Sequence, residues 1–174
     1  MDTRSEAVLS QVMPQLAALV RAAAATLEPA GTYLLVVSGL RTSAEQNALY
    51  AQGRTAPGHI VTDAKAGESM HNYGLAVDVV PYLSGDGGAL NWTIETPQYQ
   101  AMVAAMKAQG LEWGGDWAGD LGDFDHFQMA GLPASPNMAM LDDYNAGDAL
   151  PSIWSSFLVG SYDATPPSDA PVVA

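Results

Sequence analysis

The sequence predicts an α+β fold, in which helices and strands occupy separate parts of the chain. Apolar residues at helical spacing between Leu16 and Leu27 indicate a helix, whereas Tyr33–Ser38 and Ala76–Val80 are short apolar runs typical of buried strands. The strands do not alternate regularly with helices, as they would in a doubly wound sheet. This separation favours α+β over α/β.

The first part of the chain predicts one helix, one strand and a long loop. We expect the helix over Pro14–Leu27, because proline suits a first helical turn and Pro29 and Gly31 follow the periodic pattern. The strand Tyr33–Ser38 comes next. Residues 53–72 show no periodicity and predict a loop.

A short helix is expected between that strand and the loop. It begins at a capping box, for which the sequence offers two pairs: Ser43 with Gln46, or Thr42 with Glu45. We expect it to run to Gln52.

The second part of the chain predicts two more strands and another helix. The strand Ala76–Val80 is expected to stop at Pro81, and Thr96 and Pro97 open a helix that Gly110 ends. The remaining segments are a turn over 84–89, a loop over 114–122 and a short strand over 125–129.

The C-terminal part divides into a packed and a mobile segment. Residues 142–157 carry Trp154 and Phe157, so we expect them to pack on the domain. Residues 161–174 are Pro-rich, acidic and polar, and predict a flexible tail. The chain therefore divides into a domain over 1–160 and a tail over 161–174.

Composition limits the possible functions. The 174 residues fit one domain, with 6 Lys and Arg against 19 Asp and Glu and a net charge of −13. This balance argues against a protein that binds nucleic-acid phosphates or anionic membranes. Cysteine is absent, which excludes disulfides, Cys nucleophiles and Cys-ligated zinc.

Neither a secretory signal nor a membrane span is expected. Residues 1–7 are polar, and the longest apolar run, 16–27, is too short and too Ala-rich to cross a bilayer. We therefore expect synthesis in the cytoplasm and no stable membrane anchor.

Any histidine chemistry must come from His59, His71 or His126. His71 precedes a strand in whose apolar centre Asp78 lies, and a carboxylate there is costly unless it is paired or metal-bound. A turn amide or an arginine could satisfy Asp78 instead. Similarly, His126 alone could be a packed histidine between aromatic neighbours.

Taken together, these residues have the composition of a catalytic metal site. Two histidines and one aspartate leave a fourth tetrahedral position open for water, as in catalytic zinc sites. Asp123 lies three residues before His126, where it could act as a general base without being a ligand.

Several motifs occur together and in order. They are SGLR with EQNALY and GRT, then Ser69-x-His-x-x-Gly-x-Ala-x-Asp78, then EWGGDW over 112–117, and Asp123-x-x-His-Phe. With these motifs the chain, over roughly residues 10 to 130, resembles the zinc L-alanyl-D-glutamate peptidases of phage endolysins. The family includes D-alanyl-D-alanine carboxypeptidases of vancomycin resistance. The resemblance implies a Hedgehog- and DD-peptidase-like fold, a small antiparallel sheet with flanking helices.

The resemblance also implies roles for single residues. Zinc would be held by His71, Asp78 and His126. Asp123 would be the catalytic base and Arg41 would stabilise the oxyanion. Substrate contacts are implied for Ser69, Gln46 and Trp113, although a capping role for Gln46 and a core position for Trp113 remain open.

Three features depart from the family pattern or lie outside it. Asp125 stands where many relatives have proline, and it adds a second carboxylate beside the metal. His59 matches no ligand position and is interpreted as a loop histidine. Asp116, Asp120, Asp123 and Asp125 could hold calcium, but a solvated acidic loop is preferred.

The predicted function is hydrolysis of the peptide stem of peptidoglycan, between L-Ala and D-Glu, by a monomeric zinc peptidase. After release, the protein would act on the cell wall or periplasm. The alternatives are a D-Ala-D-Ala carboxypeptidase and a non-catalytic zinc-binding interaction module. A pure binder would need neither Asp123 nor Arg41.

Overall fold

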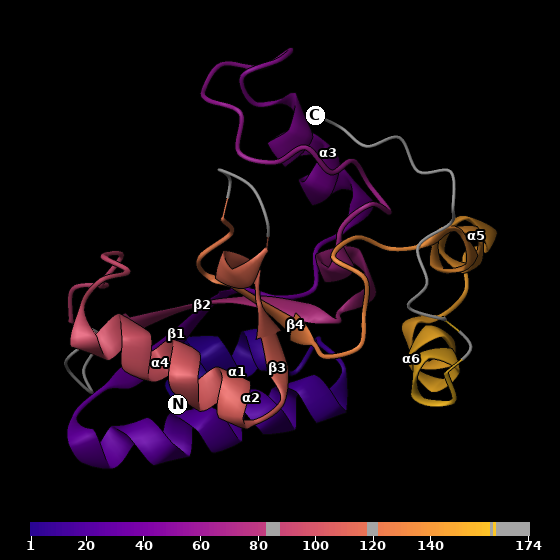
Figure 1. Ribbon diagram of the computed structural model, residues 1–174. Helices are drawn as coiled ribbons and strands as arrows, with labels where there is room; N and C mark the ends of the chain where they lie inside the picture. The colour runs from indigo at the N-terminus through magenta and orange to yellow at the C-terminus, as the bar shows by residue number, and fades with distance from the viewer. Residues whose placement is uncertain (83–87, 118–121, 161, 163–174) are drawn as a thin grey trace.

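A four-stranded antiparallel sheet occupies the middle of the molecule (Figure 1). The computed structural model describes residues 1–82, 88–117, 122–160 and 162. Within them the strand order is β1-β2-β4-β3. The strands are β1 Tyr33–Ser38, β2 Ala76–Tyr82, β3 Leu111–Trp113 and β4 His126–Met129.

The helices form three groups around this sheet (Figure 1). One face is covered by α1 Thr3–Leu9, α2 Pro14–Leu27 and α4 Pro97–Ala108. On the other side lies α3 Ser43–Ala51, and at one end α5 Met138–Ala146 and α6 Leu150–Leu158. Short 3₁₀ turns are η1 Glu28–Ala30, η2 Met70–Tyr73 and η3 Gly114–Asp116.

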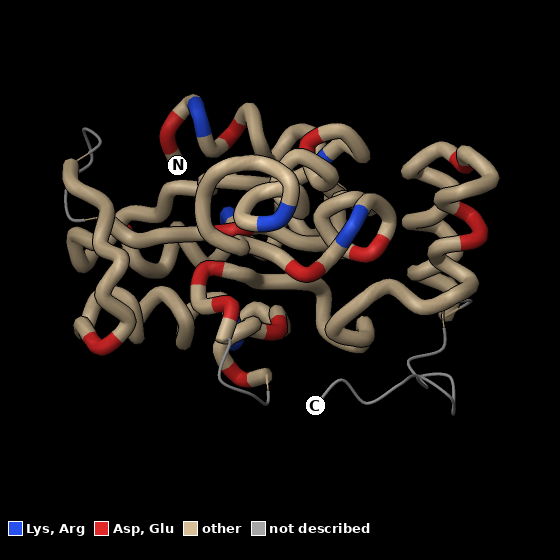
Figure 2. The backbone as a smooth tube through the Cα atoms, turned by 90° about the horizontal axis from the view of Figure 1, so that it is seen from above, with Lys and Arg blue, Asp and Glu red and all other residues tan. Residues whose placement is uncertain are grey.

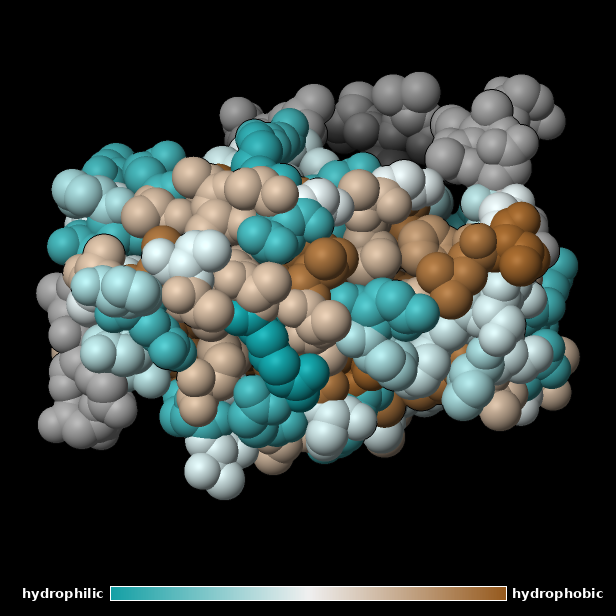
Figure 3. All heavy atoms as spheres, turned by 90° about the horizontal axis from the view of Figure 1, so that it is seen from below, coloured by the Kyte–Doolittle hydropathy of each residue, from teal (hydrophilic) through white to brown (hydrophobic). Residues whose placement is uncertain are grey.

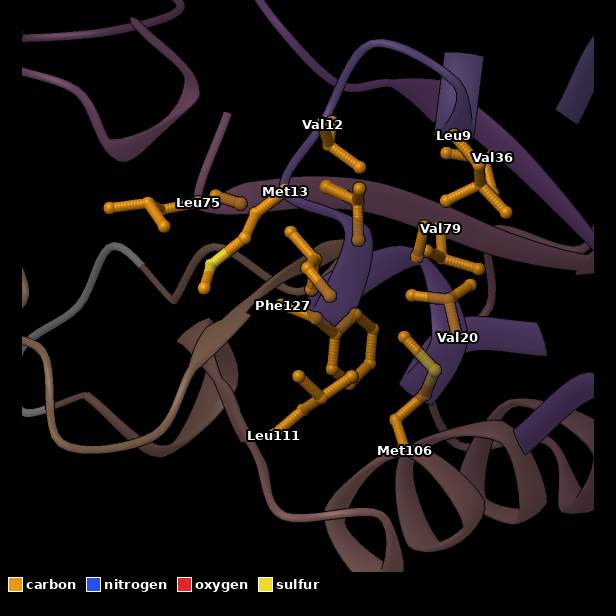
Figure 4. Packing of buried hydrophobic residues seen from close by; sticks show 14 of the residues in the cluster. Leu9, Val12, Met13, Val20, Val36, Leu75, Val79, Met106, Leu111 and Phe127 are labelled. Carbon is orange, nitrogen blue, oxygen red and sulfur yellow. The ribbon is translucent and has the colours of Figure 1, made fainter. Parts of the chain in front are cut away.

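The main hydrophobic core lies between the sheet and the first group of helices (Figure 4). Val79 and Phe127 point from the strands toward Val20 of α2 and Met106 of α4, and all four are fully buried. Burying side chains of this size contributes about 1.5–3 kcal/mol each. The packed face fixes the sheet, so its opposite face can carry polar residues.

The α+β prediction and most of the predicted elements are confirmed. The helix Pro14–Leu27 and the strand Tyr33–Ser38 are as expected, and Thr96 caps α4. At α3 the capping box is Thr42 with Glu45, because Thr42 has the extended backbone of an N-cap. Gln46 therefore plays no capping part.

The predicted end of β2 is wrong, because the strand continues through Pro81 to Tyr82. The neighbouring strand β4 pairs only with Ala76–Asp78, so beyond Asp78 the described residues place no strand along this edge of β2, apart from a single bridge between Tyr82 and Leu90. A strand edge is where proline is tolerated.

Four elements were not predicted: α1, β3, α5 and α6. Each buries too few apolar side chains to give a periodic pattern; α5, for example, buries only Met140, and α6 only Ile153. Their signals are local instead, since Asp2 caps α1 and Asn137 caps α5 through their side chains.

The C-terminal segment packs on the domain as predicted. Ile153 is buried, and the Trp154 indole donates to the carbonyl of Tyr73 at 2.7 Å. Leu158 and Val159 remain exposed, and Figure 3 shows hydrophobic residues gathered toward the end where α6 lies. None of the described helices is long and apolar enough to cross a bilayer.

The structure describes one residue of the predicted tail, Tyr162. Tyr162 is buried and its hydroxyl donates to Asp143 of α5 at 2.5 Å. Packed structure therefore extends at least to Tyr162. The rest of the predicted tail, residues 161 and 163–174, and most of the predicted turn over 84–89 lie outside the described residues.

Candidate active site

The sheet register brings three polar residues into one row on the face opposite the main core. Asp78 of β2 is paired with His126 of β4 on one side and with Ser38 of β1 on the other. A shift in register between Val36 and Ser38 turns Ser38 into this row. Arg41, two residues before α3, donates to Ser38 and Asp78 of this row.

His71 joins the row from the turn η2, which Ser69 caps by accepting a hydrogen bond from the His71 backbone. The Nδ1 atom of His71 donates to the carbonyl of Gly39 at 2.8 Å. The backbone N–H of Arg41 donates to the His71 carbonyl at 2.9 Å, and the Asn72 amide donates to the Arg41 carbonyl at 2.8 Å. These bonds hold the SGLR segment against the histidine turn.

Asp78 lies between two imidazoles and a guanidinium. Its Oδ1 is 3.1 Å from His71 Nε2 and 3.6 Å from His126 Nδ1, while its Oδ2 accepts from Arg41 at 3.2 Å. Burial opposes ionisation of this carboxyl, but the two histidines outweigh burial and hold the pKa of Asp78 well below its usual value. Asp78 thus also has the arginine partner that the sequence analysis considered, namely Arg41.

His126 is buried in the same cluster. Burial alone would lower its pKa, but the carboxylates of Asp78 and Asp123 more than offset burial and raise the pKa of His126. The site therefore stabilises positive charge at the place where a cation would lie.

The donor set of His71, Asp78 and His126 fits a metal ion. One ligand atom from each residue lies within 4.8 Å of the others. His71 Nε2 and His126 Nδ1 are 3.2 Å apart. Two ring nitrogens and a carboxylate oxygen facing one point could hold a metal ion, and this set would leave a fourth position open.

Two further carboxylates lie beside this group, Asp123 and Asp125. Asp123 is half exposed, with Oδ2 3.8 Å from His126 Nδ1. Burial and the neighbouring carboxylates of Asp78 and Asp123 raise the pKa of Asp125 to about 6.

The position of the Asp123 segment depends on Gly114 of the EWGGDW motif. A Cβ atom at Gly114 would collide with the carbonyl oxygen of Asp123 and press on the side chains of Asp123 and His126. A glycine is therefore needed for the η3 turn to approach the site this closely.

Of the four acids of the 116–125 region, the three that the structure describes do not gather at one calcium site. Asp116 pairs with Lys107 at 2.6 Å, whereas Asp123 and Asp125 face the histidines. Asp120 lies outside the described residues.

Arg41 is held in place by three side chains. Its Nη1 donates to Gln46 Oε1 at 2.9 Å, and its Nη2 donates to Ser38 Oγ at 3.1 Å and to Asp78. Gln46 is itself fully buried and donates to the carbonyl of Ala64 at 2.7 Å. Gln46 thus orients Arg41 and ties α3 to the loop before His71.

A cleft of about 620 Å³ opens over these residues. Ile60 and Val61 stand exposed on its rim, and the Trp117 ring lies beside that of His126, tilted by 53°, with ring centroids 5.0 Å apart. Its other lining residues include the predicted site residues Arg41, Ser69, His71, Asp78, Asp123 and His126.

The cleft is acidic, in keeping with the excess of acidic residues seen from the α3 side (Figure 2). Of the predicted site residues, Trp113 is absent from the described cleft lining. Trp113 lies behind the Asp123 segment, and the described cleft lining includes Trp117 in its place. His59 is an exposed loop residue, as expected.

The prediction missed several residues that support the site. Asn72 and Gln128 are buried polar residues that contact Arg41 and His126, and Tyr99 of α4 donates to the Phe124 carbonyl. The sequence offers one weak indication for Asn72 and Gln128, which stand within two residues of a predicted ligand.

Comparison with known proteins agrees with this geometry. A family model described as D-alanyl-D-alanine carboxypeptidase, of the M15 peptidases, matches residues 62–129, which contain all three candidate ligands. The peptidoglycan L-alanyl-D-glutamate endopeptidase CwlK of Bacillus subtilis is 39% identical over 128 residues, 70% of this chain and 73% of that protein. The L-alanyl-D-glutamate peptidase of Listeria phage A118 is 27% identical over 103 residues, 59% of this chain and 32% of the phage protein.

Solved structures agree as well. The L-Ala D-Glu endopeptidase ChiX of Serratia marcescens has a TM-score of 0.51 and 27% identity, covering 75% of this chain and 89% of ChiX. The LD-carboxypeptidase LdcB has a TM-score of 0.52 at 17% identity, covering 83% of this chain and 68% of LdcB, and supports the fold alone. Given the identity to CwlK over most of that protein's length, the chain belongs to the M15 peptidase family.

Proposed function

We propose that the protein is a zinc peptidase that hydrolyses the L-Ala–D-Glu bond in the stem peptide of peptidoglycan. The observation that carries this proposal is the His71–Asp78–His126 group with Asp123 beside it, at the base of an open cleft. The names of CwlK, the phage peptidase and ChiX support the choice of bond.

The zinc ion would be held by His71 Nε2, His126 Nδ1 and Asp78. When bound, zinc lowers the pKa of a water molecule and polarises a carbonyl group. The chain's own contribution is to hold the ligands in place. Asp78 and His126 lie on paired strands, and the turn that carries His71 is hydrogen-bonded to residues 39–41.

Asp123 is the proposed general base. Its side chain lines the cleft and is about half exposed, so it can reach a water molecule beside the ligands. It would take a proton from the attacking water and pass it to the D-Glu nitrogen as the C–N bond breaks. Asp125 is the weaker candidate because its side chain is more buried than that of Asp123 and so less open to a water molecule in the cleft.

Arg41 is proposed to stabilise the negative charge that develops on the L-Ala carbonyl oxygen. A guanidinium has five N–H groups, and the described contacts of Arg41 use three. The remaining N–H groups can donate toward the cleft, and the three contacts keep them from reorienting during reaction. Ser69 lines the same cleft and could also contact substrate.

At the level of the cell, we propose that the protein degrades the wall as a monomer in a lysis role, and the similarity to a peptidase of Listeria phage A118 supports this role. Its partner would be the stem peptide of peptidoglycan, reached after the protein leaves the cytoplasm.

Mass analysis of muropeptides tests the proposal directly. Purified protein loaded with zinc is incubated with purified cell walls, and Asp123→Asn is the matched control. New D-Glu amino termini that appear only with the unchanged protein support the proposal. Release of D-Ala alone would identify a carboxypeptidase, and zinc binding without any product would identify a non-catalytic module.

A further inference from the structure

Gln128 is a fully buried polar side chain for which the proposed reaction gives no role. It lies on β4 two residues after His126, so both side chains project from the same face of the strand. Its Oε1 is 3.2 Å from His126 Nε2, the ring nitrogen on the far side from Asp78.

The orientation of the Gln128 amide follows from its other neighbours. Its Nε2 donates to the carbonyl of Pro133 at 3.1 Å and to Glu112 Oε2 at 3.5 Å. Glu112 is itself held by the backbone N–H of Gly131 at 3.0 Å. Carbonyl and carboxylate oxygens only accept, so the amide nitrogen must face them and the amide oxygen must face His126.

This orientation determines which nitrogen of His126 carries hydrogen. An amide oxygen can only accept, so Nε2 of His126 donates to it, and the lone pair of a neutral ring is then on Nδ1. Nδ1 is the atom near Asp78 and His71. The carbonyl of Gly39 acts in the same way on His71, but through the opposite ring nitrogen.

We propose that Gln128, oriented by Glu112 and the Pro133 carbonyl, is a positioning residue that fixes His126 in the tautomer that binds metal through Nδ1. The inference rests on the metal site of the proposed function. It also gives Glu112, the first residue of the EWGGDW motif, a place at the site: Glu112 contacts Gln128, which contacts His126.

Zinc affinity measured by competition with a chelator is the first test. Gln128→Met keeps the length of the side chain but removes the acceptor, and zinc affinity should fall by about 10–100-fold, the usual effect of losing such a partner. Gln128→Glu keeps an acceptor oxygen toward His126, and as a neutral acid can still donate to Pro133 or Glu112. It should retain most of the affinity that Gln128→Met loses.

Ser5→Ala is the matched control. Ser5 is also fully buried, and its hydroxyl accepts a hydrogen bond from Val36 at 3.0 Å, between α1 and β1. This variant should bind zinc like the unchanged protein. Thermal unfolding of each metal-free variant shows that its fold is retained.

Nuclear magnetic resonance of the unchanged, zinc-loaded protein is the second test, and it needs no variant. With only three histidines, long-range ¹H–¹⁵N spectra can assign each ring. His126 should carry hydrogen on Nε2, whereas hydrogen on Nδ1 would overturn the inference.

The affinity results separate this inference from the proposed function. If the unchanged protein binds no zinc, the proposed function itself fails. If it binds zinc and Gln128→Met binds equally well, or if the Met and Glu variants lose equal affinity, only the role of Gln128 is wrong.

Discussion

The indole of Trp113 donates a hydrogen bond to the backbone carbonyl of Phe124 at 2.6 Å. The hydroxyl of Tyr99 donates to the same oxygen at 2.9 Å. Phe124 stands between Asp123 and Asp125, so these two donors fix the backbone that carries both carboxylates. Trp113 also packs, partly buried, against the hydrophobic core. The core position considered from the sequence is therefore confirmed, and from there the indole supports the site from behind.

Removing one of these donors should impair turnover without removing the metal. Tyr99→Phe deletes only the hydroxyl, and a shift of the Asp123 segment by a fraction of an ångström to 1 Å can cost up to about 100-fold in rate. Steady-state kinetics and metal content measure the two effects. Tyr82→Phe is the control, since the Tyr82 hydroxyl contacts Asp2 far from the cleft. Equal turnover in Tyr99→Phe and the control would contradict a positioning role.

Asp123→Asn should leave zinc bound and the fold intact but lower turnover by about 100-fold or more, the usual range for losing a general base. Asp125→Asn should cost much less. Single-turnover kinetics on a soluble muropeptide would rank the two variants, and the reverse ranking would assign the base to Asp125.

Each candidate ligand should be required for zinc. Replacing His71, Asp78 or His126 by Ala leaves two protein ligands, and zinc content and activity should be lost together. His59→Ala is the control, because His59 is an exposed loop residue. Metal analysis after gel filtration measures the zinc, and full zinc content in any of the three Ala variants would refute that ligand assignment.

Arg41→Lys should act mainly on turnover. Lysine keeps the charge but cannot donate to Gln46, Ser38 and Asp78 at once, so the remaining donors lose their orientation. Loss of one oxyanion donor typically costs about 100-fold or more in kcat. Arg21→Lys, in an exposed pair with Glu6, is the control. Weaker substrate binding at unchanged kcat would instead make Arg41 an anchor for a substrate carboxylate.

The sequence predicted the residues of this site better than their contacts. The helix over Pro14–Leu27 and the strand Tyr33–Ser38 have strong local patterns, and the candidate ligands stand in recognisable motifs. The row from Ser38 to His126, however, depends on the pairing of three strands far apart in the chain, and local patterns do not encode register.

Gln46 and Gln128 show the same limit at single residues. Gln46 was predicted to contact substrate from its motif, but its described contacts are with Arg41 and with the carbonyl of Ala64, 18 residues away. Gln128 reaches Glu112, 16 residues away, across β3 and β4. Such contacts follow from the completed sheet, because they join segments that are separate in sequence.

High pH should weaken the attachment of Tyr162. Burial and the hydrogen bond to Asp143 raise the pKa of Tyr162 to about 12. The folded state therefore favours the neutral phenol, and its stabilising contribution is complete below the unfolded pKa of about 10. The contribution is lost as pH rises from about 10 toward 12. Tyr162→Phe should reduce this part of the pH dependence of unfolding, and an unchanged profile would contradict it.

A pair of truncations locates the end of the packed chain. A chain ending at Tyr162 keeps the buried ring and its bond to Asp143, so its melting temperature should match that of the full chain. A chain ending at Gly160 loses both the ring and the hydrogen bond, so its melting temperature should be lower. Burial of such a side chain contributes about 1.5–3 kcal/mol. Each kcal/mol shifts the melting temperature of a protein of this size by about 2–4 °C. Calorimetry of both chains measures the difference. Zinc content should be unchanged in both, because the candidate ligands lie elsewhere. If the two chains melt together, Tyr162 does not stabilise the domain, and the boundary at residue 160 stands.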